Sequence, residues 1–166
     1  MHVVVMGVTG CGKTTVGLRL AAETHAEFAD ADDFHSPDAV AKMAANVPLE
    51  DDDRWPWLER VGAWLADGEH RVVACSALKR AYRDAIREHA PDAIFIHLRA
   101  PQATLEARVR RRSRATGHYA GAGLLDSQFA ILEGLADDEV GASIDVRDAT
   151  PEGAVLIARA AIDMRA

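Results

Sequence analysis

The sequence has little of what marks membrane, disulfide-bonded or nucleic-acid-binding proteins. Only two of its 166 residues are cysteines, and aromatic residues make up 5% of the chain. No apolar run approaches the ~20 residues of a membrane-spanning helix, and we find no repeat, low-complexity tract or secretory signal. Basic residues number 19 against 26 acidic ones, for a formal net charge of −7. This balance disfavours general binding to nucleic acid or to an anionic membrane.

The cysteines and the chain length indicate the compartment of the protein and its number of domains. Cys11 lies in a glycine-rich stretch and Cys75 ends an apolar run, where neither a disulfide framework nor a zinc site is the natural interpretation. The reducing cytoplasm suits such a chain. The length predicts a single domain, residues 1–166, with a small mobile part.

One stretch organises the rest of the chain: Gly7-Val8-Thr9-Gly10-Cys11-Gly12-Lys13-Thr14 matches the phosphate-binding loop G-x-x-x-x-G-K-[ST]. Glycines let backbone N–H groups turn inward around phosphate oxygens, and the helix that follows presents its positive end to them. We expect this stretch and Thr15 to bind ATP, with Lys13 reaching the β- and γ-phosphates and Thr14 holding Mg²⁺ through its hydroxyl. The alternative is a glycine-rich turn that binds nothing, and the apolar run before the motif and the helical pattern after it disfavour that.

Short apolar or β-branched runs alternate with longer helical patterns along the whole chain. The expected strands are Val3–Met6, Glu27–Asp30, Arg71–Cys75, Ala93–Leu98 and Ser143–Val146. The expected helices are Lys13–Thr24, Asp38–Ala45, Asp52–Asp67, Lys79–His89, Pro101–Arg112, Ala122–Leu135 and Pro151–Met164. This order predicts an α/β fold with a five-stranded parallel sheet flanked by helices. Ligands of such sheets bind at the carboxyl ends of the strands.

Acidic residues follow the second expected strand. The third strand ends at Cys75 without the aspartate that many P-loop proteins place near Mg²⁺, so we expect Asp32 to serve the metal and to act as general base toward the acceptor. Asp30 and Asp33 are candidates for outer-shell or structural partners. The alternative is that these aspartates only form a turn. His35 either binds substrate hydroxyls or braces that turn.

Basic residues beside the acceptor region indicate a bound anion. Arg54 follows the acidic run Glu50–Asp53 and sits beside Trp55 and Trp57, where its planar fork is suited to grip a carboxylate. Lys79 and Arg83 are four residues apart at an expected helix start, where cations oppose the helix dipole and a bound anion would explain them. A solvated helix start accounts for most of the acidic run itself, since aspartate favours the first turn of a helix.

An arginine-rich helix follows the fourth expected strand and carries Arg108, Arg110, Arg111, Arg112 and Arg114. We interpret residues 108–123 as a lid over ATP, from which Arg108 or Arg112 neutralises the transferred phosphoryl group on closure. A nucleic-acid patch is the alternative, and the acidic chain and the lack of interleaved aromatics disfavour it. His118 and Gln128 flank the glycine-rich tip and either reach the substrate or are structural.

Several blocks resemble, in order and spacing, the gluconate kinase family over nearly the whole chain. They are Gly7–Thr14; Asp30-Ala31-Asp32 with His35-Ser36-Pro37; Asp51-Asp52-Asp53-Arg54 with Pro56-Trp57-Leu58; Cys75-Ser76-Ala77-Leu78-Lys79-Arg80 with Tyr82-Arg83-Asp84; and Gly117-His118-Tyr119 with Ser127-Gln128-Phe129. The resemblance implies ATP-dependent phosphorylation of the 6-hydroxyl of D-gluconate. It also implies a P-loop fold similar to nucleoside monophosphate and shikimate kinases with a mobile lid, and a homodimer. Residues 34–68 would form the substrate-binding helical part.

Two alternatives to this function stay open from the residues themselves. A kinase of shikimate or another small metabolite shares the phosphate loop, although Ser76-Ala77-Leu78-Lys79 replaces the glycine triplet expected of shikimate kinases. A non-catalytic nucleotide-binding switch would need no acceptor site. Within the loop, Cys11 stands in place of a small hydroxyl residue. We expect the surrounding amides and Lys13 to favour its thiolate, against the alternative of an inert buried thiol.

Overall fold

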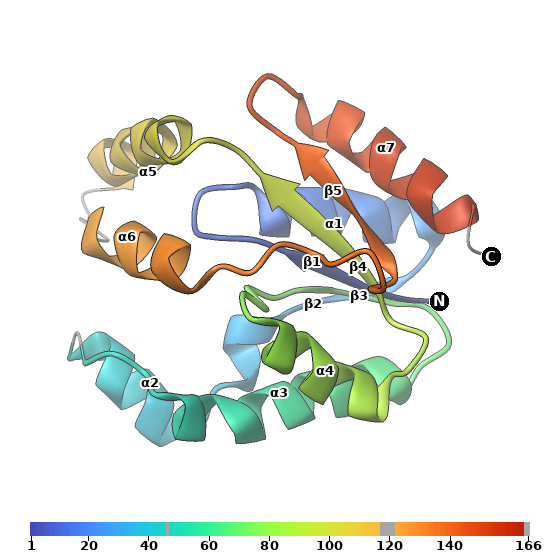
Figure 1. Cartoon of the computed structure of the whole chain (residues 1–166), viewed down its shortest axis with the longest axis horizontal. Coiled ribbons are helices and arrows are strands. Elements are labelled where there is room, and N and C mark those ends of the chain that lie inside the picture. The colour runs from blue at the N-terminus through green and yellow to red at the C-terminus, as the bar shows by residue number, and fades with distance from the viewer. Residues whose placement is uncertain (46, 117–121, 165–166) are drawn as a thin grey trace.

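The protein is built on a five-stranded parallel sheet with strand order β2-β3-β1-β4-β5 (Figure 1). The structure, a computed structural model, describes residues 1–45, 47–116 and 122–164. The strands are β1 (His2–Met6), β2 (Glu27–Asp30), β3 (Arg71–Ala74), β4 (Ile94–Arg99) and β5 (Gly141–Asp145). The predicted α/β class and parallel five-stranded sheet are therefore confirmed.

The helices follow the predicted order with shifted ends. They are α1 (Lys13–Thr24), α2 (Pro37–Ala44), α3 (Asp51–Ala66), α4 (Arg80–His89), α5 (Gln102–Thr116), α6 (Ala122–Ile131) and α7 (Pro151–Asp163). Local chemistry sets several starts: Ser36 caps α2 and Thr150 caps α7, each followed by proline at the first helical position. None of the described helices is long and apolar enough to cross a membrane.

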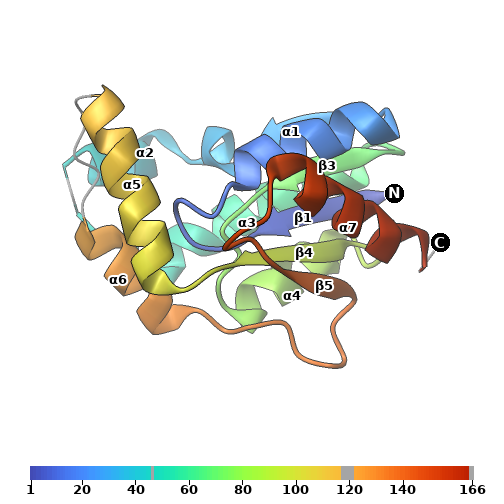
Figure 2. The same ribbon diagram turned by 90° about the horizontal axis from the view of Figure 1, so that it is seen from above.

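Alternate residues of each central strand face opposite layers of helices. In β1, Val3 and Val5 pack in the cluster that includes residues of α1 and α7, whereas Val4 and Met6 pack in the cluster that includes residues of α3 and α4. Figures 1 and 2 show these two layers on either side of the sheet. Because both faces are covered, the inner strands are almost wholly apolar.

The carboxyl edge of the sheet carries the loop after β1, with α2, α5 and α6 on that side of the molecule (Figures 1 and 2). Two helices there differ from prediction. α5 runs to Thr116 instead of Arg112, since arginine and alanine are good helix formers and Glu106 pairs with Arg110 one turn on. α6 ends at Ile131 instead of Leu135, because the Glu133 N–H donates to the Leu78 carbonyl at 2.8 Å and the chain leaves the helix.

A short 3₁₀ helix, η1 (Ala31–Phe34), follows β2 where a loop was expected. The Asp30 carboxylate caps it by accepting the Asp32 N–H at 3.1 Å. The Trp57 indole N–H donates to the Ala31 carbonyl at 2.6 Å and fixes η1 against α3. Asp32 is thus presented on a short, braced element directly after a sheet strand.

Candidate active site

The loop after β1 has the backbone that phosphate binding requires. Gly10 and Gly12 have φ of 80° and 99°, a region that favours glycine, and they turn the chain into the start of α1. A Cβ on Gly10 would also lie 2.9 Å from the Val109 Cγ2 atom of α5. The Lys13 ammonium donates to the Val8 carbonyl at 3.1 Å, so it lies folded over its own loop. The motif therefore forms a loop and a helix start directly after strand β1, as predicted.

Two aspartates stand beside the start of α1, and the structure distinguishes them. The Thr14 hydroxyl donates to Asp30 Oδ2 at 3.0 Å, whereas Asp32 lies on η1 with an exposed side chain. Thr14 and Asp32 are the residues that the sequence assigns to the metal, and in the structure Asp30 is the carboxylate that Thr14 contacts. A hydroxyl and carboxylates are oxygen donors that suit Mg²⁺, which is usually held by one or two carboxylates together with substrate phosphates. Consistently, no cluster of three or more metal-binding side chains occurs among the described residues.

The environment of Asp32 suits a proton acceptor. Desolvation by the surrounding protein and the neighbouring Asp30 charge raise the pKa of Asp32, against smaller opposing effects of His35 and Lys13. A carboxylate with a raised pKa is a stronger general base.

His35 lies next to Asp32, and its side chain is almost fully buried. Its ring stacks on Trp57 with centroids 4.5 Å apart and an interplanar angle of 12°. Its Nε2 atom is 3.8 Å from Asp32 Oδ1, and only 5% of its side chain is exposed. Burial lowers the pKa of His35, which keeps the ring neutral. The interpretation that His35 braces this turn therefore has direct support, while contact with substrate hydroxyls stays a prediction.

Arg54 and Lys79 converge on one carboxylate, although they come from different elements. Asp51 accepts hydrogen bonds from Arg54 Nη1 at 3.2 Å and from Lys79 Nζ at 3.0 Å. The Tyr82 hydroxyl also donates to Asp51, and both cations lie over the Tyr82 ring, at 5.7 and 5.2 Å from its centroid. Hydrogen bonds from Tyr82 and Lys79 lower the pKa of Asp51, and the bond to Asp51 raises the pKa of Lys79. We call these four residues the Asp51 cluster.

Arg83 does not belong to the substrate site, and that prediction is wrong. Its side chain is wholly buried and pairs with Glu139, with Nε to Oε1 at 2.7 Å and Nη2 to Oε2 at 2.7 Å. It also donates to the carbonyls of Ala77, Glu133 and Gly134. All of its hydrogen-bonding capacity is directed into the protein, where it ties the β3–α4 loop to the chain that follows α6.

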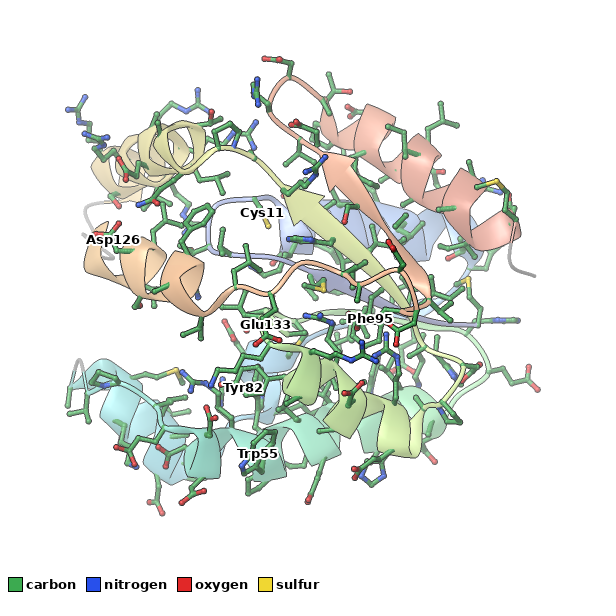
Figure 3. All side chains as sticks on the ribbon, in the orientation of Figure 1. Cys11, Trp55, Tyr82, Phe95, Asp126 and Glu133 are labelled. Atoms are coloured by element: carbon green, nitrogen blue, oxygen red, sulfur yellow. The ribbon has the colours of Figure 1, made fainter. Side chains whose placement is uncertain are left out.

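The physical reason for this error lies in the start of α4. Lys79 is the N-cap of that helix, with φ −96° and ψ 151°, so Lys79 and Arg83 do not share a helical face. The helix start is instead capped by Glu133, whose carboxylate accepts the Arg80 N–H at 2.7 Å. Figure 3 shows Glu133 and Tyr82 in this region.

Gln128 contacts the phosphate loop. Its Oε1 atom accepts the Thr9 N–H at 2.6 Å, which brings α6 against the start of the loop. From the sequence, Gln128 either reaches the substrate or is structural, and this contact supports the structural alternative. Nothing in the sequence spacing could indicate a contact across 119 residues.

The predicted lid arginines lie on α5. Arg108 Nη2 donates to the Val146 and Arg147 carbonyls, at 2.6 and 3.0 Å, so this side chain contacts the chain after β5. Arg112 is exposed on the same helix. His118 lies outside the described residues. The predicted delivery of Arg108 or Arg112 to the transferred phosphoryl group stays a prediction.

Cys11 is buried in the loop, with 2% of its surface exposed (Figure 3). Burial raises the pKa of the Cys11 thiol more than Lys13 and the loop amides lower it. Burial likewise raises the pKa of Cys75 to about 12. The expectation of a favoured Cys11 thiolate is therefore wrong, because desolvation of the charge outweighs the positive surroundings.

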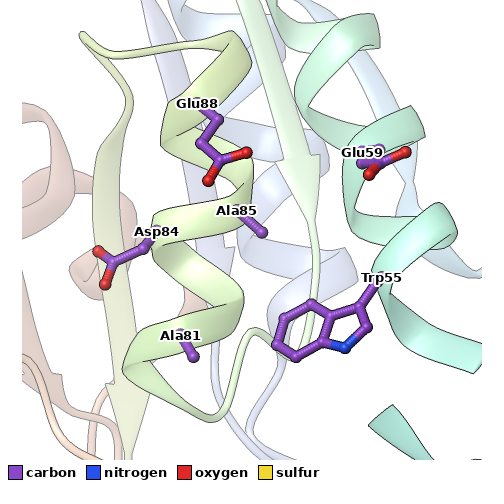
Figure 4. Close-up of a pocket in the computed structure, with 6 residues that line it drawn as sticks. All are labelled: Trp55, Glu59, Ala81, Asp84, Ala85 and Glu88. Carbon is purple, nitrogen blue, oxygen red and sulfur yellow. The ribbon is translucent and has the colours of Figure 1, made fainter. Parts of the chain in front are cut away.

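A separate hollow of about 400 Å³ lies between α3 and α4 (Figure 4), lined by Trp55, Glu59, Ala81, Asp84, Ala85 and Glu88. None of the predicted site residues lines it. Trp55 packs edge-on against Tyr82, with centroids 5.6 Å apart, so the hollow lies next to the Asp51 cluster.

A family model, curated relatives and a solved structure all match this chain. A family model described as shikimate kinase matches residues 9–128. The chain is 40% identical over 140 residues to the thermosensitive gluconokinase of Escherichia coli K12, covering 82% of this chain and 73% of that one. It is 43% identical to a gluconokinase of Gluconobacter oxydans, covering 82% and 77% of the two chains. A gluconokinase structure from Sinorhizobium meliloti superposes with a TM-score of 0.89 at 38% identity, covering 99% of this chain and 93% of that one.

Proposed function

Because the chain belongs to the gluconokinase family of P-loop kinases, we propose that it transfers the γ-phosphoryl group of ATP to the 6-hydroxyl of D-gluconate, giving 6-phospho-D-gluconate and ADP. The observation that carries the choice of acceptor is the convergence of Arg54 and Lys79 on one carboxylate in the Asp51 cluster. Two cations and a tyrosine hydroxyl that meet around a carboxylate are suited to a sugar acid.

In this proposal the phosphate loop and Asp32 perform the chemistry between them. The loop amides and Lys13 hold the donor phosphates, and Arg108 and Arg112 stabilise the transferred charge. Asp32 orients the attacking hydroxyl and accepts its proton, which its raised pKa favours. Catalysis rests mainly on placement and charge stabilisation, as is general for phosphoryl transfer.

Magnesium is part of the proposal. Thr14 would hold the ion through its hydroxyl, with Asp30 and Asp32 as the nearby carboxylates. When bound, Mg²⁺ neutralises charge on the β- and γ-phosphates of ATP.

The substrate range tests the acceptor assignment. We expect ADP release with gluconate, and none above background with shikimate or nucleoside monophosphates, in a coupled assay at equal concentrations. Turnover with shikimate would favour the family whose model matches residues 9–128. ATP binding without turnover on any acceptor would favour a nucleotide-binding switch.

Side-chain substitutions test the site itself. Arg54→Met and Lys79→Met should each raise KM for gluconate about tenfold or more, with KM for ATP nearly unchanged, because each removes a charged partner of the acceptor carboxylate. An unchanged gluconate KM in both variants would remove these residues from the acceptor site.

We also propose the remaining family features for this chain. Residues 34–68 would form the acceptor-binding part and residues 108–123 the lid, of which 117–121 lie outside the described residues. A cytoplasmic homodimer that binds no nucleic acid fits the resemblance and the net charge of −7. Light scattering coupled to gel filtration should give about 36 kDa for the dimer, twice the chain mass of 17.9 kDa. A mass near that of one chain would contradict the dimer.

A further inference from the structure

We propose that Asp51 is a positioning residue that holds Arg54 and Lys79 in the geometry that receives the acceptor carboxylate. The inference rests on the proposed function and assigns a role within its acceptor site. Asp51, Asp52 and Asp53 look alike in the sequence but differ in their contacts.

The three consecutive aspartates at the start of α3 have three different environments. Asp53 accepts the Glu50 N–H at 2.9 Å and Lys42 Nζ at 2.6 Å, so it caps the helix and ties α2 to it. Asp52 is exposed. Asp51 turns toward α4 and bonds to Arg54, Lys79 and Tyr82. Successive helical residues point about 100° apart, which separates the three side chains.

Asp51 reduces the repulsion between the two cations of the proposed acceptor site. Arg54 and Lys79 both lie within 3.2 Å of Asp51 Oδ1, so their like charges are close together. The carboxylate between them offsets this repulsion and leaves the cluster with one net positive charge, which matches one acceptor carboxylate. Without Asp51 the two long side chains would separate.

Donors remain for the acceptor when Asp51 is in place. Arg54 uses only Nη1 toward Asp51 and Tyr82, and among the described residues no group accepts a hydrogen bond from its Nε or Nη2. The side chains of Arg54 and Lys79 are 25% and 28% exposed, so a small molecule can reach them. Asp51 therefore orders the cations without using up their binding capacity.

The expected effect follows from the freedom that Asp51 removes. Immobilising a rotamer-rich side chain has an entropic cost, and two such side chains are ordered here before the acceptor arrives. Asp51→Asn should therefore raise KM for gluconate roughly tenfold, because the substrate must then order both cations itself. KM for ATP and kcat should change less than twofold, since the phosphate loop and Asp32 do not contact Asp51.

The matched control is Asp52→Asn, which removes the same charge from the next residue of the same helix turn. We expect it to leave KM for gluconate unchanged, so that long-range charge cannot explain the Asp51 effect. Tyr82→Phe keeps the ring beneath both cations but removes one donor to Asp51, and should raise the same KM about threefold. It also provides a readout if Asp51→Asn is too poorly folded to measure.

Two results would overturn the inference. A lower gluconate KM in Asp51→Asn would mean that Asp51 competes with the acceptor carboxylate. Equal constants for the Asp51 and Asp52 variants would mean that Asp51 has no role in binding. If Arg54→Met and Lys79→Met raise KM while Asp51→Asn does not, only this inference fails. If none of them changes KM, the proposed acceptor site fails with it.

Discussion

The buried pair of Arg83 and Glu139 makes the sharpest prediction about stability. Glu139→Gln keeps the shape of the side chain but leaves the Arg83 guanidinium charged, desolvated and without its counter-ion. Both side chains are closed to solvent, at 0% and 1% exposure. Such a charge cannot recover hydration while the protein stays folded.

The expected loss of stability follows from the change in the pKa of Glu139 on folding. Although burial opposes ionisation of Glu139, hydrogen bonds and charge from Arg83, with the Ala136 N–H, lower its pKa from 4.5 to about 2. A shift of this size corresponds to about 3 kcal/mol at neutral pH, similar to the measured cost of breaking buried ion pairs. For a chain of this length, that loss lowers Tm by about 6–12 °C.

The lowered pKa of Glu139 also determines how the stability difference changes with pH. Because the folded-state pKa of Glu139 is lowered, its stabilisation is present above pH 4.5 and is lost as pH falls toward 2. Burial lowers the pKa of His97 to about 4 and also lowers that of His35, so both rings contribute acid destabilisation below pH 6.5, which is common to wild type and variant. The difference in unfolding free energy between the two proteins should be constant from pH 7 to 5 and should narrow below pH 4.5.

Urea denaturation followed by circular dichroism measures this difference. Asp138→Asn is the control, because Asp138 also pairs with an α4 arginine, Arg80, but with side chains 66% and 45% exposed. We expect it to cost less than about 1 kcal/mol. Arg83→Met combined with Glu139→Leu should be less destabilised than Glu139→Gln alone, because the fully buried guanidinium is removed, and Arg87, which also pairs with Glu139, keeps its second partner Asp84. Equal costs for the Glu139 and Asp138 variants, or a difference that does not narrow in acid, would refute the reasoning.

Three further predictions concern the reaction and the loop. Asp32→Asn should lower kcat a hundredfold or more with ATP affinity kept, because it removes the proposed proton acceptor. Near-normal turnover would exclude Asp32 as the base. Gln128→Ala should raise KM for ATP about threefold through loss of the Thr9 contact, whereas a rise confined to gluconate would restore its substrate role. Cys11 and Cys75 should both react slowly with iodoacetamide at pH 7 in peptide mass mapping, because both are buried; rapid labelling of Cys11 that MgATP prevents would contradict this.

The sheet and the phosphate loop were predictable because their signals are local. The loop motif is contiguous, and α1 begins and ends where predicted, at Lys13 and Thr24. Most other boundaries differ by one or two residues, as fraying ends do. The four-residue differences in α5 and α6 have other causes. α5 continues on helix propensity and the Glu106–Arg110 pair, and α6 stops because Leu78, more than fifty residues earlier, accepts a backbone hydrogen bond from Glu133.

The candidate site was predictable only in part, because it depends on contacts between distant residues. Residue chemistry was enough to propose Arg54 and Lys79 as anion partners, but Asp51 looked like any acid at a helix start. Its role emerges only where α3 packs against α4 and brings Tyr82 to it. Asp51, Asp52 and Asp53 are adjacent and chemically identical in the sequence, so nothing in it indicated that their side chains have different environments.

Burial explains why two similar arginine–carboxylate contacts should have different consequences when broken. The Arg83–Glu139 pair is closed to solvent, so removal of one partner leaves a charge that nothing solvates, and the loss appears as stability. The Arg54–Asp51 pair is 25% and 42% exposed, so water can solvate whichever partner remains. The loss of Asp51 should then change Tm little and should appear in substrate affinity, because what disappears is the ordering of two flexible cations. The same type of contact therefore stabilises the fold where it is buried and orders the proposed binding site where it is partly exposed.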